Sequence, residues 1–357
     1  MVTILKRPSS SVANDVTTHI AHETPKVKII DPNKLIPTGS TMLNLALSDT
    51  PYGGYYLGTL ANIIGDKHTG KTFLSLNACA DITYQNLFPN YQLIYDDVER
   101  RLKIDVAEMF GQRTKERVNI EHTSVVEDWY QKSRAKVAKK EKFMWFLDSL
   151  DHISTEEERK KTKVARDYSE KPLLLTQMFT RIWNDLAEAE AFFCIISQTR
   201  QNIGVGAMFQ PRRRAGGDIL GFVATHEVWL GMVERIKRGP QTNTKEVGIK
   251  VEARVEKNSL TGRRRRVRFD IIRDYGIDDV GSMIDWLLKE GFWNKPANQT
   301  KIHCASDATF LPSSATKDEL TEHVDANNLG KQLQGYVGRC WIIAEEKVAT
   351  NRRRRYE

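Results

Sequence analysis

The sequence predicts an α/β fold with a mostly parallel central sheet flanked by helices, a β-hairpin at the sheet edge and a small C-terminal helical domain. Two observations carry this prediction. Apolar runs of strand length alternate with longer helix-like stretches such as Leu173–Ala189, and this alternation is typical of βαβ units. The apolar run Leu60–Ile64 also leads through a glycine-bounded turn into helix-like spacing, as expected for a strand, a loop and a helix.

The predicted elements follow one another along the chain. A short helix is expected at Leu43–Leu47, ahead of the strand Leu60–Ile64. Further buried strands are predicted at Leu93–Tyr95, Phe143–Leu147, Phe192–Ile196 and Val228–Leu230. Beyond them, Lys250–Val255 and Arg265–Ile272 alternate like the arms of a β-hairpin. The sequence shows no internal repeat, so we assign these strands to one core.

The rest of the chain is predicted to be helical. Gly276–Phe292 has the spacing of an amphipathic helix, and Lys317–Val348 is a second helical region after the polar stretch Asn294–Ser314. We therefore divide the chain into an N-terminal arm of residues 1–34 that serves oligomerisation, a core of residues 35–275, and a C-terminal α-rich domain of residues 276–357 with a basic tail.

Composition narrows the class of protein. The 357 residues are 40% hydrophobic and 28% charged, which are ordinary globular values. The longest apolar runs, Phe143–Leu147 and Ala191–Ile196, are far shorter than the roughly 20 residues that cross a bilayer, so no membrane span is expected. The four cysteines form no CxxC pair, and no secretory signal is visible. These features predict a cytoplasmic protein with free thiols.

Positive charge is concentrated in three arginine clusters. Arg212–Arg214, Arg263–Arg266 and Arg352–Arg355 together hold more positive charges than the whole net excess of +8. Localised clusters favour binding of a polyanion at chosen places, and nucleic acid is the polyanion we expect. Solvated surface is the alternative interpretation.

A phosphate-binding loop stands after the predicted strand Leu60–Ile64. Its residues are Gly65, Asp66, Lys67, His68, Thr69, Gly70, Lys71 and Thr72, which satisfy the pattern G-x-x-x-x-G-K-[ST]. The glycines let backbone N–H groups turn toward phosphate oxygens, and the helix N-terminus favours negative charge. Lys71 would neutralise the β- and γ-phosphates, and the Thr72 hydroxyl would ligate Mg²⁺.

Two carboxylates complete the predicted active site. Asp148 closes the apolar strand Phe143–Leu147 and is the expected second Mg²⁺-site group, although an aspartate there can simply cap a strand. Glu99 follows the strand Leu93–Tyr95 at the same expected sheet edge, and it is our candidate for the base that deprotonates water. A solvated acidic turn is the alternative for Glu99.

With these motifs in order along the chain, the sequence resembles the RecA recombinases. The resemblance rests on the phosphate loop and on Ile36–Ser40, Asn44–Leu47, Asp97–Glu99, Leu147–Ser149 and Ile196–Arg200, in this order. Gln198–Pro211, followed by Gly216-Gly217, resembles the second DNA-binding loop of RecA. Val255–Asn258 and Tyr275–Asp278 are similar to phage UvsX-type recombinases. The resemblance extends from about Leu35 to Phe292 and implies a RecA-like P-loop ATPase core.

The resemblance implies roles for individual residues of the ATPase. Lys71, Thr72 and Asp148 would contact phosphate and Mg²⁺, and Glu99 would be the catalytic base. Gln198 would couple the γ-phosphate to the DNA loop, for which a neutral amide is chemically suited. Lys257 would reach the γ-phosphate of a neighbouring subunit. Ser259 departs from the family pattern, which has a second basic residue there.

It also implies a DNA-binding segment. The residues expected to contact DNA are Arg200, Asn202, Ile203, Gly204, Val205, Met208, Phe209, Arg212, Arg213, Arg214, Gly216 and Gly217. Phe209 would insert as an apolar wedge between bases, while the arginines would bind phosphates. Ser154–Lys171 occupies the place of the first DNA loop, but a solvated helix is equally compatible with its sequence. The cluster Arg263–Arg266 would bind duplex DNA or supply charge to a neighbour's nucleotide.

The resulting hypothesis is a DNA-dependent ATPase that uses ATP and Mg²⁺ to form helical filaments on single-stranded DNA. It would pair this strand with homologous double-stranded DNA and exchange strands. Further expected partners are single-strand-binding and mediator proteins, and a bacteriophage source would place it in the bacterial host cytoplasm. Two alternatives share the motifs: a ring-shaped hexameric DNA helicase, and a RecA-fold regulatory or packaging ATPase that acts without DNA.

Overall fold

The central feature of the computed structural model is one large sheet. The structure describes residues 30–160, 170–201, 212–214, 219–240, 243–350 and 352. Within them, the strand order is β12-β11-β10-β9-β3-β7-β6-β4-β5, and β8 pairs with β7 off this path. The strands are β3 (Leu60–Gly65), β4 (Gln92–Asp97), β5 (Val118–Glu121), β6 (Phe143–Asp148), β7 (Phe192–Gln201), β8 (Arg212–Arg214), β9 (His226–Arg238), β10 (Lys245–Asn258), β11 (Arg266–Ile272) and β12 (Gly276–Asp278).

This sheet has a parallel part, from β9 to β5, and an antiparallel part, from β10 to β12. Strands β9, β3, β7, β6, β4 and β5 run in the same direction. The next three strands are antiparallel to their neighbours: β10 pairs with β9, β11 with β10, and β12 with β11. The parallel strands have almost continuous apolar sequences because both faces of the sheet are covered. The predicted α/β class with a mostly parallel sheet and a β-hairpin edge is confirmed.

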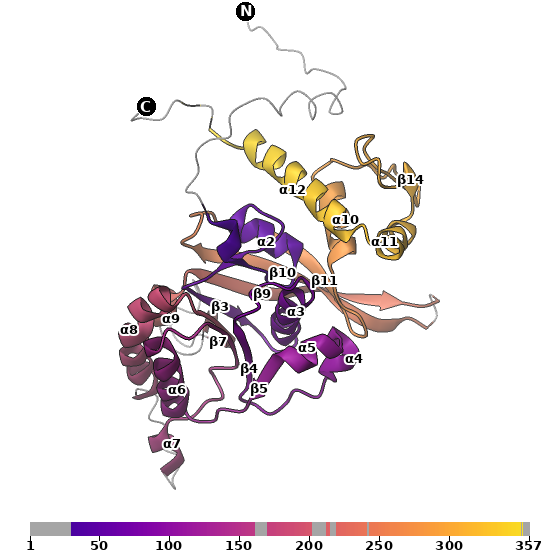
Figure 1. Cartoon of the computed structure of the whole chain (residues 1–357). Coiled ribbons are helices and arrows are strands. Elements are labelled where there is room, and N and C mark those ends of the chain that lie inside the picture. The colour runs from indigo at the N-terminus through magenta and orange to yellow at the C-terminus, as the bar shows by residue number, and fades with distance from the viewer. Residues whose placement is uncertain are drawn as a thin grey trace, which may run out of the picture.

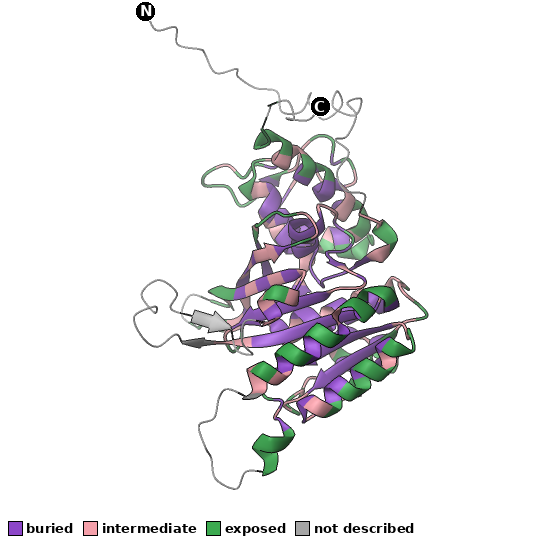
Figure 2. Cartoon of the chain, turned by 90° about the vertical axis from the view of Figure 1, so that its left-hand side faces the viewer, coloured by how far each residue is buried: buried purple, intermediate pink, exposed green. Residues whose placement is uncertain are grey.

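Helices cover the two faces of the sheet (Figure 1). The helices of the core are α2 (Thr41–Ser48), α3 (Lys71–Tyr84), α4 (Val106–Phe110), α5 (Gln112–Arg117), α6 (Val126–Ala138), α7 (Glu156–Lys160), α8 (Glu170–Ala189) and α9 (Ile219–Val223). One buried cluster joins α6 and α8 to the sheet through Trp129, Phe179 and Phe193. A second cluster joins α2, α3 and the C-terminal helices to the other face. Figure 2 shows the exposed outer sides of helices over buried strands.

The strands β9 and β10 are both longer than the predicted strands Val228–Leu230 and Lys250–Val255, and they form an antiparallel hairpin. Strand β9 runs alongside β3 only as far as Leu230, which pairs with Gly65 at the end of β3. It then continues to Arg238 and returns through β10 from Lys245, so the hairpin projects beyond the sheet (Figure 1). Beyond Leu230 the apolar residues Met232 and Val233 are exposed and charged residues follow them, so the pattern Val228–Leu230 marks only the buried start of β9.

The C-terminal region contains α10 (Asp279–Lys289), α11 (Lys317–Ala326) and α12 (Gly330–Lys347). The predicted helix Gly276–Phe292 needs one correction, because its first residues form β12 and the helix begins only at Asp279. Asp278 explains this start, since its carboxylate accepts the N–H of Gly281 at 2.8 Å as a helix cap.

Small elements complete the described chain. They are the 3₁₀ turn Pro32–Lys34, the ribbon β1 (Leu35–Ile36) with β2 (Tyr55–Tyr56), and the ribbon β13 (Ile302–His303) with β14 (Ser314–Ala315). The predicted boundaries of the arm and of the C-terminal domain remain predictions. Most of the arm, residues 1–29, lies outside the described residues, as does the basic tail apart from Arg352.

Candidate active site

The phosphate loop lies where the sequence predicts it, between β3 and α3. Lys71 folds back over the loop, and its ammonium donates to the carbonyl oxygens of Gly65 (2.9 Å) and Asp66 (2.6 Å). Burial lowers the pKa of Lys71, while the nearby carboxylates of Asp148 and Asp66 oppose this shift. Gly70 has φ +83° and faces the Ile271 side chain, so a Cβ there would be strained and would clash. Lys67 and His68 are exposed on the loop's outer side, and Thr69 is buried.

Asp148 ends β6 beside the first turn of α3. Its Oδ2 atom accepts hydrogen bonds from the Thr72 hydroxyl at 2.6 Å and from the Tyr95 phenol at 2.7 Å. Burial raises the pKa of Asp148, and these two donors counteract it by stabilising the carboxylate. A carboxylate and a hydroxyl oxygen at this distance are a donor set that suits Mg²⁺. The structure thus brings the two predicted metal residues together.

Glu99 follows β4 at the same edge of the sheet, and several donors surround its carboxylate. Oε1 contacts His152 Nδ1 at 2.5 Å, and it accepts hydrogen bonds from Ser149 Oγ and Gln198 Nε2, each at 3.2 Å. Oε2 forms an ion pair with Arg101 at 2.9 Å. The predicted base and the predicted sensor Gln198 are therefore in direct contact.

Strand β7 links this cluster to the phosphate loop. The N–H of Gln198 donates to Asp151 Oδ2 at 2.5 Å, and the Thr199 hydroxyl donates to the carboxylate of Asp66. Both contacts lie at the carboxyl ends of parallel strands, the edge at which open α/β sheets bind ligands. A change in the position of β7 would therefore alter the contacts of both Glu99 and the phosphate loop.

The predicted DNA-binding residues lie partly within the described chain. Strand β8 pairs with the end of β7, so that Arg200 is opposite Arg213, and Thr199 is opposite Arg214. Like charges at directly opposed positions destabilise a strand pair unless counter-charge is supplied. The positions Asn202, Ile203, Gly204, Val205, Met208, Phe209, Gly216 and Gly217 lie outside the described residues.

Lys257 does not lie at its own chain's phosphate loop. It pairs with Glu227 in the sheet register, and Glu227 pairs with Asn62, three residues before the end of β3. Its ammonium donates to the carbonyl oxygens of Gly221 (2.9 Å) and Phe222 (2.8 Å) at α9. Lys257 therefore lies toward the sheet edge opposite the loop.

The cluster Arg263–Arg266 is largely used within the chain. Arg265 is almost buried and pairs with Asp49 (2.5 Å) and Glu345 (2.8 Å), and Arg263 also pairs with Glu345 at 2.7 Å. These contacts fasten α12 to the core. Two of the four arginines that we considered for DNA or nucleotide binding thus hold the C-terminal region in place.

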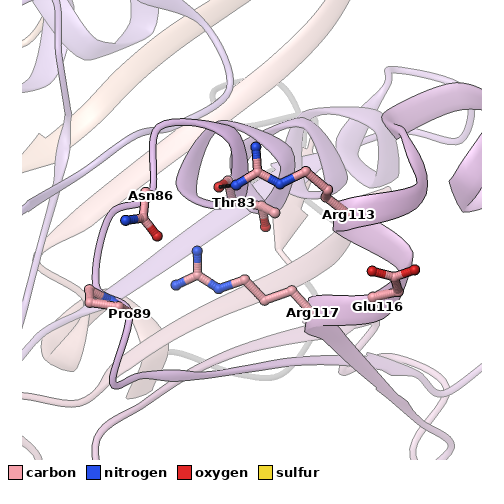
Figure 3. A pocket seen from close by; sticks show the side chains of 6 residues that line it. All are labelled: Thr83, Asn86, Pro89, Arg113, Glu116 and Arg117. Carbon is pink, nitrogen blue, oxygen red and sulfur yellow. Dashed lines mark hydrogen bonds between the residues drawn. The ribbon is translucent and has the colours of Figure 1, made fainter.

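A surface pocket of about 330 Å³ lies between the end of α3 and α5, away from the phosphate loop. Figure 3 shows Arg113 and Arg117 projecting from α5 toward Thr83, Asn86 and Pro89. The Arg117 guanidinium donates to the carbonyl oxygens of Ile82, Leu87 and Phe88 at 2.6–3.0 Å. Arg117 therefore satisfies the carbonyls at and after the end of α3.

Sequence reasoning missed several residues of this site. They are Tyr95, Arg101, Ser149, Asp151, His152 and Thr199. Each lies within four positions of a predicted residue, so proximity in sequence was the available signal. Closeness in sequence does not show which of these residues contact the site, because the turns after β4 and β6 decide which side chains point at Glu99.

Taken together, the open α/β sheet, the phosphate loop and the paired Thr72 and Asp148 define a P-loop nucleotide-binding protein. A family model described as the RecA N-terminal domain matches residues 20–278. The chain belongs to the RecA family, and the predicted resemblance is confirmed. The closer likeness to phage UvsX-type proteins stays a prediction.

Several bacterial proteins are similar to the chain over most of its length. It is 27% identical to protein RecA of Streptomyces ambofaciens over 327 residues, which are 90% of this chain and 82% of the relative. It is 25% identical to protein RecA 2 of Myxococcus xanthus, with 89% and 84% covered. It is 24% identical to protein RecA of Mycobacteroides abscessus, with 90% and 89% covered.

Among the helices of the described residues, none combines the length and the apolar character needed to cross a bilayer.

Proposed function

We propose that the protein is a DNA-dependent ATPase that forms helical filaments on single-stranded DNA and catalyses homologous pairing and strand exchange. Membership of the RecA family supports this function. The observation that carries it is the hydrogen bond between Gln198 Nε2 and Glu99 Oε1 at 3.2 Å. Gln198 stands on β7, which continues into the arginine-bearing pair β7–β8. A candidate base is thus one contact away from a candidate DNA-binding element.

The nucleotide would bind at the phosphate loop as ATP with Mg²⁺. Lys71 would leave its carbonyl partners for the β- and γ-phosphates, and Thr72 and Asp148 would hold the metal ion. When bound, Mg²⁺ neutralises phosphate charge. Glu99 would orient the attacking water and accept its proton, because it is the carboxylate just beyond β4 on the loop side of the sheet.

The DNA would bind along β7, β8 and the segment that joins them. Phosphate oxygens would neutralise the opposed arginines at positions 200 and 213, and Phe209 would separate bases. Binding of this kind is electrostatic and nearly independent of sequence, so affinity should fall steeply with salt. Base pairing would then select the homologous duplex.

The placement of Lys257 supports assembly of the protein into a filament. Its own phosphate loop lies toward the other edge of the sheet, so it would complete a neighbour's ATP site in a head-to-tail contact. Repeated contacts of this kind generate either a helix or a ring. Two interaction partners, single-strand-binding and mediator proteins, are proposed from the family alone.

The test is negative-stain imaging of the full chain with single-stranded DNA and a non-hydrolysable ATP analogue. Helical filaments on the DNA are expected, and strand exchange should then be measured with ATP. Closed rings would instead favour a hexameric helicase, and particles that ignore DNA would favour a DNA-independent ATPase.

Two variants test the chemistry. Lys71→Ala should lose ATP-dependent DNA binding, because the phosphates lose their cation. Glu99→Gln should bind DNA with ATP but turn over at least about 100-fold more slowly, as expected when a general base is removed. Normal turnover by Glu99→Gln would exclude Glu99 as the base.

A further inference from the structure

His152 is a residue of the Glu99 cluster to which the chemistry proposed above gives no role. Its Nδ1 atom lies 2.5 Å from Glu99 Oε1 and 3.0 Å from Ser149 Oγ. An ionised carboxylate only accepts hydrogen bonds, so Nδ1 must carry a proton in the contact with Glu99. The Glu99 side chain is 14% exposed, whereas that of His152 is 35% exposed. The imidazole thus lies on the outer side of a nearly buried carboxylate.

The carboxylate of Glu99 is crowded with donors in this structure. A carboxylate has about four lone-pair positions on its two oxygens. His152, Ser149 and Gln198 converge on Oε1, and Arg101 holds Oε2. A general base must have a lone pair directed at the proton that it takes. Glu99 held in this way is poorly placed to accept a proton from water.

The loop that carries His152 is tied to two elements of the core. Asp151 accepts the backbone N–H of Gln198 at 2.5 Å, which fastens the loop to β7. Lys171, at the start of α8, donates to the carbonyl oxygens of Leu150 (2.9 Å) and Ile153 (2.5 Å). The loop therefore follows β7, the strand that carries the proposed DNA contacts. A displacement of β7 would move Gln198 and His152 together.

We propose that His152 is a positioning residue that restrains Glu99 in the DNA-free protein, and that DNA bound at β7–β8 releases this restraint. The inference rests on the proposed role of Glu99 as base. His152 would act together with Ser149, Gln198 and Arg101 on the Glu99 carboxylate, and its loop is hydrogen-bonded to β7 through Asp151. ATP hydrolysis without DNA is then slow because the base is held, and not because ATP binds weakly.

The test is steady-state ATP hydrolysis by the full chain, with and without single-stranded DNA. His152→Ala is expected to raise kcat without DNA by about 10-fold, and to leave KM for ATP within about twofold, because it frees the base without touching the phosphates. His152→Asn places an amide donor near the position of Nδ1 and should restore the low DNA-free rate. His122→Ala is the matched control, since His122 Nδ1 lies 3.0 Å from the Asp97 carbonyl oxygen at the same edge and so contacts the main chain instead of the Glu99 carboxylate.

Two results would overturn the proposal. One is a DNA-free kcat of His152→Ala that equals or falls below that of the unchanged chain while the variant melts at the same temperature. The other is a rise that His152→Asn and His122→Ala show equally, which would indicate general loosening of this edge. Glu99→Gln tests the role of Glu99 separately from that of His152, because normal turnover by Glu99→Gln would refute the assignment of Glu99 as the base.

Discussion

At the scale of single residues, two hydrogen bonds to one oxygen atom position the carboxylate of Asp148. Its Oδ2 atom is shared by the Thr72 hydroxyl and the Tyr95 phenol, and burial alone would favour the neutral acid. Tyr95 is itself buried in β4, so its hydroxyl can point only along the sheet edge toward Asp148. The hydrogen bond from the phenol therefore opposes the rise in the pKa of Asp148 and orients its carboxylate toward Thr72.

Tyr95→Phe should therefore weaken binding of ATP with Mg²⁺ by about 10-fold, the loss typical when a group that orients a metal ligand is removed. Titration with a fluorescent ATP analogue at several Mg²⁺ concentrations measures it. Tyr91→Phe is the control, because the Tyr91 phenol only donates to the Glu190 carbonyl oxygen at 3.4 Å. Equal affinities for the two variants would contradict the role of Tyr95.

At the scale of elements, one cation just before β11, Arg265, ties α12 to the core. Arg265 pairs with Asp49 and Glu345, and its guanidinium stacks on Trp341 at 5.2 Å from the ring centre. Trp341 Nε1 also donates to Asp49 at 3.0 Å. Removal of a buried cation leaves its carboxylate partners uncompensated, which costs more than the pair itself contributes.

Arg265→Ala should lower the free energy of unfolding by about 3 kcal/mol for this reason. Arg268→Ala, the matched control, removes an exposed pair with Glu252 (2.9 Å) and should cost less than about 1 kcal/mol. Denaturant unfolding followed by tryptophan fluorescence distinguishes the two. A loss of the same size for both variants would mean that α12 does not depend on Arg265.

A second element contact involves two carboxylates. Asp81 on α3 lies near Asp279 at the start of α10, and burial together with Asp279 raises the pKa of Asp81 to about 8. The folded protein therefore holds a proton on Asp81 that the unfolded chain releases above about pH 4. Stability should fall as pH rises from about 4 to about 8, and it should stay level above that range.

Asp81→Asn should abolish this part of the pH dependence, because asparagine stays neutral. We expect its melting temperature at pH 8 to exceed that of the unchanged chain by at least about 2 °C, with little difference near pH 4. The exposed Asp185 on α8 provides the control Asp185→Asn. Parallel pH curves for Asp81→Asn and the unchanged chain would refute the assignment.

At the scale of the whole molecule, the two halves of the proposed ATP site lie toward opposite edges of one sheet. The phosphate loop and Glu99 follow the carboxyl ends of β3 and β4, whereas Lys257 lies toward the other edge, at α9. In this structure Lys257 therefore lies away from the phosphate loop of its own chain. Under the proposed function, activity belongs to the contact between subunits.

Mixing two inactive variants tests this arrangement. Lys71→Ala lacks a working loop but supplies Lys257, and Lys257→Ala retains the loop. A random equal mixture should recover about a quarter of the normal DNA-stimulated ATPase rate. Half of the subunits have an intact phosphate loop, and half of their neighbours supply Lys257. The control replaces Lys71→Ala with the double variant Lys71→Ala/Lys257→Ala, and it should stay inactive. Equal rates in both mixtures would exclude donation between subunits.

Much of the fold was predictable because local patterns agreed with one another. Continuous apolar runs marked β3, β6 and β7, and the spacing of Gly65, Gly70 and Lys71 placed the phosphate loop. Asp148 and Glu99 were predictable because carboxyl ends of parallel strands share one edge. The projection of β9–β10 was not, since its exposed strands are not apolar.

The amino-acid sequence was enough to locate the apolar strand cores and the phosphate loop and to indicate the RecA family. Those features depend on residue type and spacing along the chain, and these are visible without a fold. The packing of the fold brings His152, Ser149 and Gln198 together at Glu99, and it pairs Arg265 with Asp49 and with Glu345 of α12. These contacts join residues from separate turns and strands, and the packing of the sheet sets their distances.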